Sequence, residues 1–355
     1  MFINPVQASL FNLGGFLSHH DSQSLPRGKK AMFEELGLIG NAIILLVTLV
    51  ALAKASELTI TNSVNVASVT GLGKTTVGFI LVAFSTSLPE FFVAIFAVFE
   101  PENVGVSIGN ALGSNIVNIC LILGICFLLI VLKYPRSERF LPKMAKEELG
   151  SLHFGLFIAS IVPIALLYIG YASRLIGIIL LVIFLFYMYK LSKAKTPEEE
   201  LSETDKTKLG RYTVLTVLGA VSVVVCAFFI VESASFIAES IGIPPLMIGA
   251  TVVAFGTSLP ELATSISAVN RKHLDLTLGN IIGSCFINIT LILGVTLVSS
   301  PFIINVAAFS NVALFSLMTN LLLWYFLSGE KIGGREAAVF LFMYALFLAV
   351  SLGAS

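Results

Sequence analysis

Two acidic residues, Glu90 and Glu261, lie inside long apolar segments, and each directly follows a proline. Neither segment contains a Lys or Arg that would pair with the carboxylate. A charge at the centre of a bilayer costs at least about 2.5 kcal/mol, so such a side chain needs a partner, a cavity or an ion. Two acids in matching surroundings favour a cation site over the alternative, a protonated acid bonded to a backbone carbonyl.

The prolines supply further oxygen atoms. Pro89 and Pro260 lack an N–H and clash with the carbonyl four residues earlier, which opens a helix. We expect the carbonyls of residues 83–86 and 254–257 to be released. Lipid tolerates released carbonyls only where they line a cavity or bind something. For either proline alone, a simple kink is the alternative.

Hydroxyl and amide groups complete the set of oxygens. The hydroxyls beside the prolines belong to Thr86, Ser87, Thr257 and Ser258. Two further pairs, each four residues apart and on one helix face, are Ser114 with Asn118 and Ser284 with Asn288. Singly, such residues more often form interhelical hydrogen bonds. The neighbouring glycines, expected to allow close helix packing, are Gly109, Gly113, Gly279 and Gly283.

These groups offer oxygen ligands only, which suit Ca²⁺ rather than softer metals. Two carboxylates match the charge of one divalent cation, and the same oxygens suit several Na⁺. One ligand set cannot bind one Ca²⁺ and several Na⁺ at the same time, so the two kinds of ion compete. Competition at one site with alternating access is antiport, with Ca²⁺ and Na⁺ as the transported ions and no cofactor.

The composition is that of an integral membrane protein. Of 355 residues, 57% are hydrophobic and 12% charged, against about 25% charged in soluble domains. This excludes a soluble enzyme, a disordered chain and a disulfide scaffold, and the zero net charge gives no field for nucleic acid. Protease and ATP-binding motifs are missing, so we predict no enzymatic activity. The four cysteines lie in apolar runs, and we expect them to be small buried hydrophobic residues.

Ten apolar runs have the length needed to cross a hydrocarbon core of about 30 Å. They cover about 37–55, 76–99, 105–131, 152–169 and 173–191, then 212–240, 244–269, 274–298, 304–327 and 335–353. The expected fold class is therefore an all-α polytopic membrane protein with ten transmembrane helices.

The two halves of the chain repeat each other. VAFSTSLPE (82–90) matches VAFGTSLPE (253–261) at eight of nine positions, and GNALGSNIVNICLILG (109–124) matches GNIIGSCFINITLILG (279–294) at ten of sixteen. Five spans separate the copies, and because five is odd, the copies cross the membrane in opposite directions. Two inverted five-helix repeats are typical of secondary transporters, whose sites lie near the midplane. We expect an N-terminal extracellular segment (1–36), a first repeat (37–191), a cytoplasmic connector (192–211) and a second repeat (212–353).

The basic residues orient these spans. Of the 21 Lys and Arg, 17 fall on the face that carries the connector and 4 on the other. The positive-inside rule makes the first face cytoplasmic and places both termini outside. The partners expected are the lipid bilayer and the ions; the sequence indicates no nucleic acid and no obligatory protein partner.

The repeated blocks G-T-S-L-P-E and G-S-x-x-x-N resemble the α-repeats of the Ca²⁺/cation antiporter superfamily, most closely the compact prokaryotic form of the sodium/calcium exchanger family. The resemblance covers residues 37–353 and implies that Glu90 and Glu261 bind Ca²⁺ with Thr86 and Thr257. It implies Na⁺ sites formed with Ala83, Ser87, Ser114, Ala254, Ser258 and Ser284, and a central role for Asn118 and Asn288. It also implies that helices 37–55 and 212–240 slide to alternate access, and that the location is a prokaryotic plasma membrane.

Two departures bear on the coupling ion. Some prokaryotic members carry Asp where this chain has Asn118 or Asn288, and proton/calcium members carry an acid where this chain has Gly113 and Gly283. Both favour Na⁺ over H⁺. The open alternatives are H⁺- or K⁺-coupled exchange, exchange of Mg²⁺ or Mn²⁺, a channel, and a receptor or scaffold that transports nothing.

Overall fold

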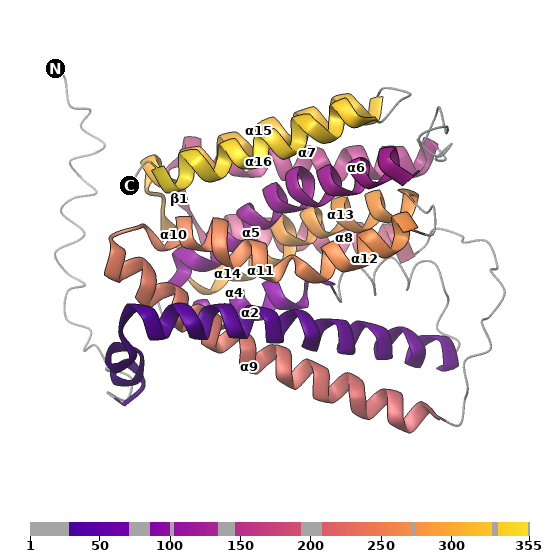
Figure 1. The fold of residues 1–355 in the computed structure, drawn as a ribbon. Coiled ribbons are helices and arrows are strands. Elements are labelled where there is room, and N and C mark those ends of the chain that lie inside the picture. Colours follow the sequence, from indigo (N-terminus) through magenta and orange to yellow (C-terminus); the bar gives the residue numbers. More distant parts are fainter. Residues whose placement is uncertain are drawn as a thin grey trace, which may run out of the picture. The chain divides into compact units, whose positions relative to one another are not determined.

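The computed structural model describes residues 28–70, 86–99, 103–133, 146–192, 208–270, 274–328 and 333–353 (Figure 1). The helices of the first half are α2 (Gly28–Thr70), α4 (Leu88–Ala97), α5 (Val104–Ile116), the π-helical turn η3 (Val117–Leu123), α6 (Gly124–Lys133), α7 (Lys146–Ile169) and α8 (Arg174–Ser192). Those of the second half are α9 (Leu209–Ile241), α10 (Pro245–Ile248), η5 (Gly249–Val253), α11 (Ala254–Thr257), α12 (Leu259–Asn270), α13 (Leu274–Ile287), η6 (Asn288–Ile292), α14 (Leu293–Ser299), α15 (Val306–Ser328) and α16 (Gly334–Gly353).

Several helical runs have the length and hydropathy of membrane spans. Six runs of the described residues qualify, namely Phe33–Thr59, Val104–Lys133, Leu209–Ile241, Thr277–Ser299, Val306–Ser328 and Gly334–Ser351. A seventh, Pro245–Asn270, is bent by 43°. The all-α polytopic class is therefore confirmed. The count of ten stays a prediction, because residues 76–85 of the second expected span lie outside the described residues and three further apolar helices are shorter.

Helix α2 is interrupted at Gly37, whose φ of 63° lies in the left-handed region that glycine adopts without steric cost. The chain divides into two compact units at this point, and residues 38–355 form the larger one. Everything described below belongs to this larger unit.

The centre of the larger unit is the continuous helix formed by α5, η3 and α6. Every residue of α5 is buried. Glycines let this helix touch the backbone of α10 and η5: a Cβ added to Gly109 would lie 2.0 Å from the Leu246 carbonyl oxygen, and one added to Gly113 would lie 2.2 Å from that of Ala250. The expectation that these two glycines permit close packing is confirmed.

The substitution Gly113→Ala should destabilise the protein, because the added methyl group meets backbone atoms that have no alternative rotamer. Overpacking of this kind costs about 1–3 kcal/mol. We expect the melting temperature of the detergent-solubilised protein to fall by several degrees. Gly210→Ala on α9 is the matched control, since its Cβ would meet nothing within 4 Å, and its melting temperature should not fall. Equal melting temperatures for the two variants would contradict this packing account.

Helices α2 and α9 lie side by side and share an apolar cluster that is separate from the main core (Figure 1). Leu45, Leu49 and Leu52 of α2 pack in this cluster with residues of α9 between Val223 and Ala238, and with Val93 of α4. The two helices to which the resemblance assigns a sliding movement therefore pack in a hydrophobic cluster that is distinct from the main core and that also includes residues of α4, α5, α10 and η5. The sliding itself stays a prediction.

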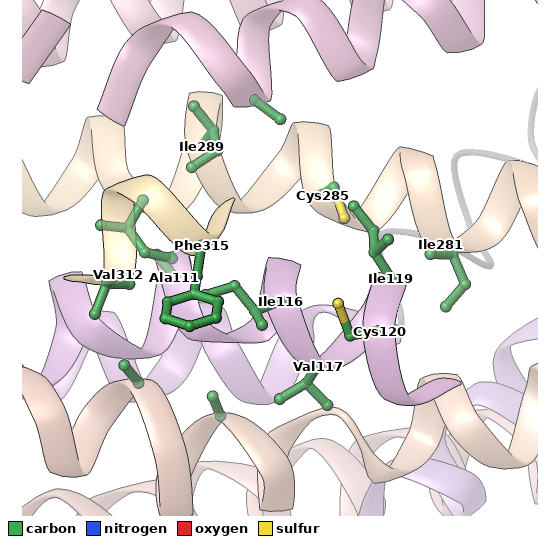
Figure 2. Close-up of a cluster of buried hydrophobic side chains, with 14 of the residues drawn as sticks. Ala111, Ile116, Val117, Ile119, Cys120, Ile281, Cys285, Ile289, Val312 and Phe315 are labelled. Atoms are coloured by element: carbon green, nitrogen blue, oxygen red, sulfur yellow. The ribbon is translucent and has the colours of Figure 1, made fainter. Parts of the chain in front are cut away.

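The main core joins the two halves of the sequence through α5, η3, α13 and η6. Figure 2 shows Ile116, Ile119 and Cys120 from the first half gathered with Ile281, Cys285 and Ile289 from the second. All four cysteines are buried and free, as predicted. A two-residue antiparallel pairing of β1 (Tyr171–Ala172) with β2 (Phe302–Ile303) ties the segment after α7 to the segment after α14.

Candidate ion-binding site

The two prolines lie at equivalent positions in the first turn of a new helix. Ser87 (φ −85°, ψ 5°) and Ser258 (φ −84°, ψ 6°) have nearly identical dihedral angles, and a new helix starts directly after each. Proline fits the first turn of a helix, where its missing N–H costs nothing. Each glutamate then lies in the first turn of α4 or α12, where the positive end of the helix dipole favours a carboxylate.

Both carboxylates are fully buried and held by serine hydroxyls. Glu90 Oε1 accepts hydrogen bonds from Ser114 Oγ at 3.5 Å and from Ser258 Oγ at 3.3 Å. Glu261 Oε1 accepts one from Ser284 Oγ at 3.2 Å. The bond from Ser258 to Glu90 crosses between the two halves, so neither half forms the site alone.

A second group of contacts extends the site along α13 and η3. Ser284 Oγ lies 3.0 Å from Ser87 Oγ and accepts a hydrogen bond from Asn118 Nδ2 at 3.2 Å. Asn118 lies in η3, and Asn288 begins η6, so the same motif position forms a π-helical turn in each half. Such turns occur frequently at functional sites.

Four acceptor oxygens of the site are buried and lack a hydrogen-bond partner within the described part of the chain. They are Glu90 Oε2, Glu261 Oε2, Asn118 Oδ1 and Asn288 Oδ1. An unsatisfied buried polar group costs about 1–3 kcal/mol, and more when it is charged. Two carboxylate and two amide oxygens in one region, all without a proton donor, are what a hard cation requires.

The structure brings together most of the residues that the sequence predicted. Fully or almost fully buried side chains belong to Thr86, Ser87, Glu90, Ser114, Asn118, Thr257, Ser258, Glu261, Ser284 and Asn288. The Ala254 carbonyl, which was expected to be released, accepts hydrogen bonds from Ser258 N at 3.1 Å and Thr257 Oγ1 at 3.3 Å, so that expectation is wrong for this residue. Ala83 lies outside the described residues. The role of each residue as an ion ligand stays a prediction.

Sequence reasoning missed two asparagines that support the predicted threonines. Thr257 Oγ1 donates to Asn110 Oδ1 at 3.0 Å, and Thr86 Oγ1 lies 3.4 Å from Asn280 Oδ1. Both contacts cross between the halves. The signal was available, because Asn110 and Asn280 are matched across the two repeat copies. Glu232, a half-buried acid on α9, was also left out.

A search of protein families matches the chain to the family described as sodium/calcium exchanger protein, over residues 40–193 and 211–353. The chain belongs to the sodium/calcium exchanger family. The family assignment makes this protein a transporter, as predicted. It is a multi-pass integral membrane protein, and its general activity is antiport of Ca²⁺ against another cation.

Three relatives are similar to this exchanger over most of its length. An uncharacterised membrane protein of Methanocaldococcus jannaschii is 32% identical over 86% of this chain and 95% of its own. The inner membrane protein YrbG of Escherichia coli is 32% identical over 81% and 89%. The sodium/calcium exchanger MaX1 of Methanosarcina acetivorans is 29% identical over 87% and 98%.

Solved structures agree with this fold. The sodium-calcium exchanger NCX_Mj, soaked with Na⁺ and Sr²⁺, superposes with a TM-score of 0.62 at 29% identity, over 88% of this chain and 98% of that one. The H⁺/Ca²⁺ exchanger CAX superposes with a TM-score of 0.71 over 98% and 90%, but at 17% identity this likeness concerns the fold alone.

Proposed function

We propose that this exchanger moves Ca²⁺ out of the cell in return for Na⁺, by alternating access at one shared site. The observation that carries the proposal is the group of four buried oxygens without partners, contributed by Glu90, Glu261, Asn118 and Asn288. Two of them belong to carboxylates, whose formal charge matches one Ca²⁺. The serine hydroxyls now donate hydrogen bonds to the glutamates. When an ion binds and these bonds break, the hydroxyl oxygens can offer their lone pairs to the ion.

Ion competition follows from how few carboxylates the site contains. Ca²⁺ needs both glutamates, with Thr86 and Thr257 beside them, and Na⁺ needs the same glutamates together with Ala83, Ser87, Ser114, Ala254, Ser258 and Ser284. A site filled with Na⁺ is therefore closed to Ca²⁺. An inward Na⁺ gradient then drives Ca²⁺ outward.

Na⁺ is favoured over H⁺ as the coupling ion by the packing of Gly113. A Cβ at this position would lie 2.4 Å from Ala250 Cα, so an acidic side chain has no room there. The name of the relative MaX1, a sodium/calcium exchanger, agrees with Na⁺. The second candidate is H⁺-coupled exchange, because two buried carboxylates also bind protons and the fold is shared with an H⁺/Ca²⁺ exchanger.

Reconstitution in liposomes tests the proposal. Uptake of ⁴⁵Ca²⁺ should require an outwardly directed Na⁺ gradient in vesicles loaded with Na⁺. Gradients of H⁺ or K⁺ of the same size should give no uptake above that of empty liposomes. Mg²⁺ and Mn²⁺ at equal concentration should compete only weakly. Uptake driven by H⁺ alone would replace the proposal with the second candidate, and uptake without any counter-gradient would indicate a channel.

We further propose a plasma-membrane location, on the resemblance to the compact prokaryotic exchangers. The distribution of basic residues supports an orientation with the connector (192–211) in the cytoplasm and both termini outside. A cysteine introduced at Thr204 should be labelled by a membrane-impermeant maleimide only after the cells are opened. The wild-type chain is the control, because its four cysteines are buried and should stay unlabelled. Labelling of the Thr204→Cys variant in intact cells would overturn this orientation.

A further inference from the structure

Asn115 is a buried amide that the repeat does not duplicate. It lies in α5, directly after Ser114, and its side chain is fully buried. The matching position of the second repeat copy holds Cys285, which offers no amide. The role of the Asn115 side chain therefore has no equivalent in the second repeat copy.

The Asn115 amide makes two hydrogen bonds to the second half of the chain. Its Nδ2 donates to the Cys285 carbonyl oxygen at 3.3 Å, and its Oδ1 accepts from Asn288 Nδ2 at 3.2 Å. Both ends of the amide are therefore used. The Asn288 Oδ1 that remains is buried and has no partner.

These two bonds form a chain with one permitted direction. A backbone carbonyl only accepts, so Asn115 must turn its NH₂ group to Cys285. Its oxygen then faces Asn288, which must in turn present its own NH₂ group. Asn288 is left with its carbonyl oxygen free, as a cation requires. Cys285 belongs to the buried core cluster that also contains Cys120 and Ile119 (Figure 2).

Asn118 is oriented differently. Its NH₂ group donates to the Ser284 hydroxyl, which in turn donates to Glu261. A hydroxyl both donates and accepts, so this orientation depends on a carboxylate that the ion itself contacts. The orientation of Asn288 depends instead on a backbone carbonyl, which no bound ion changes.

We propose that Asn115 is a positioning residue that fixes the Asn288 amide with its oxygen available to Ca²⁺. This role rests on the proposed function, because it concerns the same site. Without Asn115 the Asn288 amide is free to rotate and to offer its NH₂ group to the ion, which weakens binding. Residues that orient metal ligands commonly contribute about 10–100-fold in affinity.

Equilibrium ⁴⁵Ca²⁺ binding to the purified full-length protein tests the role. Asn115→Leu keeps the volume but neither donates nor accepts, and should raise the Ca²⁺ dissociation constant about tenfold. The same substitution should change the constant less than about twofold in an Asn288→Ala background, where no amide is left to orient. It should also not raise the constant in an Asn288→Asp background, since a carboxylate has no NH₂ group to misdirect and cannot donate to Asn115. Asn115→Ala repeats the series if the leucine variant does not fold.

Asn320→Leu is the matched control, because Asn320 is a buried asparagine on α15 without a described contact to the site, and the constant should not change. An equal effect of Asn115→Leu in all three backgrounds would show a merely structural role and overturn the inference. An unchanged constant in the wild-type background would overturn it as well. If the wild-type protein binds no Ca²⁺, the proposed function fails and the positioning role fails with it; if it binds Ca²⁺, only the inference is at stake.

Discussion

Glu90→Ala and Glu261→Ala should each abolish Na⁺-driven Ca²⁺ uptake, since each removes half of the formal negative charge that balances the cation. Breaking a buried charge pair by removing one partner costs about 3–5 kcal/mol, which corresponds to a loss of Ca²⁺ affinity of more than about 100-fold. Uptake of ⁴⁵Ca²⁺ into proteoliposomes under an imposed Na⁺ gradient measures the flux. The two variants should behave alike, because the hydrogen bond from Ser258 to Glu90 joins both halves in one site.

Glu57→Ala is the control for this pair of variants. Glu57 is an acid on α2 that is exposed and paired with Lys54 at 3.0 Å, so its loss should leave uptake unchanged. Thermal melting with and without Ca²⁺ separates a binding defect from misfolding. The wild-type protein and Glu57→Ala should melt at a higher temperature in Ca²⁺, because a ligand that binds the folded state stabilises it, and the site variants should not. Robust uptake in either site variant would contradict the shared-carboxylate mechanism.

Raising the Na⁺ concentration on one side of the membrane should raise the apparent KM for Ca²⁺ measured on that side. It should not lower the maximal rate at saturating Ca²⁺. The dependence on Na⁺ should be steeper than first order, because replacing the charge of one Ca²⁺ takes more than one Na⁺. Initial rates of ⁴⁵Ca²⁺ uptake across a grid of Ca²⁺ and Na⁺ concentrations measure both quantities. The effect should be large, since full occupancy by Na⁺ removes every Ca²⁺ ligand.

Protons and K⁺ provide the comparison for this competition. Acidification should also raise the apparent Ca²⁺ constant, because a protonated carboxyl group is no longer a Ca²⁺ ligand, and saturating Ca²⁺ should suppress this effect. K⁺ in place of Na⁺ should leave the constant unchanged. Inhibition by Na⁺ that lowers the maximal rate while the Ca²⁺ constant stays fixed would place Na⁺ and Ca²⁺ at separate sites.

The sequence alone identified the membrane class, the repeat and the two glutamates. These features depend on composition, on spacing and on the cost of a charge in an apolar segment, all of which are local. The helix breaks were predictable for the same reason: Pro89 and Pro260 act on their own helices, and the matching dihedral angles of Ser87 and Ser258 follow from that local effect.

The partners of these groups required the tertiary structure. Contacts such as Ser258 with Glu90, and Thr257 with Asn110, join residues 168 and 147 positions apart. Their geometry is set by how closely α5 packs against α10 and η5, which no pattern along one helix specifies. Sequence reasoning judged each hydroxyl only from its neighbours in the chain. It therefore identified the oxygen atoms but not which of them already form hydrogen bonds within the fold.

The orientation of the amides shows the same division. The sequence placed Asn118 and Asn288 at matched positions and treated them as equivalent. Only the folded chain shows that Asn288 is held by Asn115 and through it by the Cys285 carbonyl, whereas Asn118 is held by a serine hydroxyl. The sequence identified most of the oxygen-bearing groups of the candidate site. The direction in which each one points was decided by tertiary contacts, because a hydrogen bond depends on where its donor and acceptor meet in space.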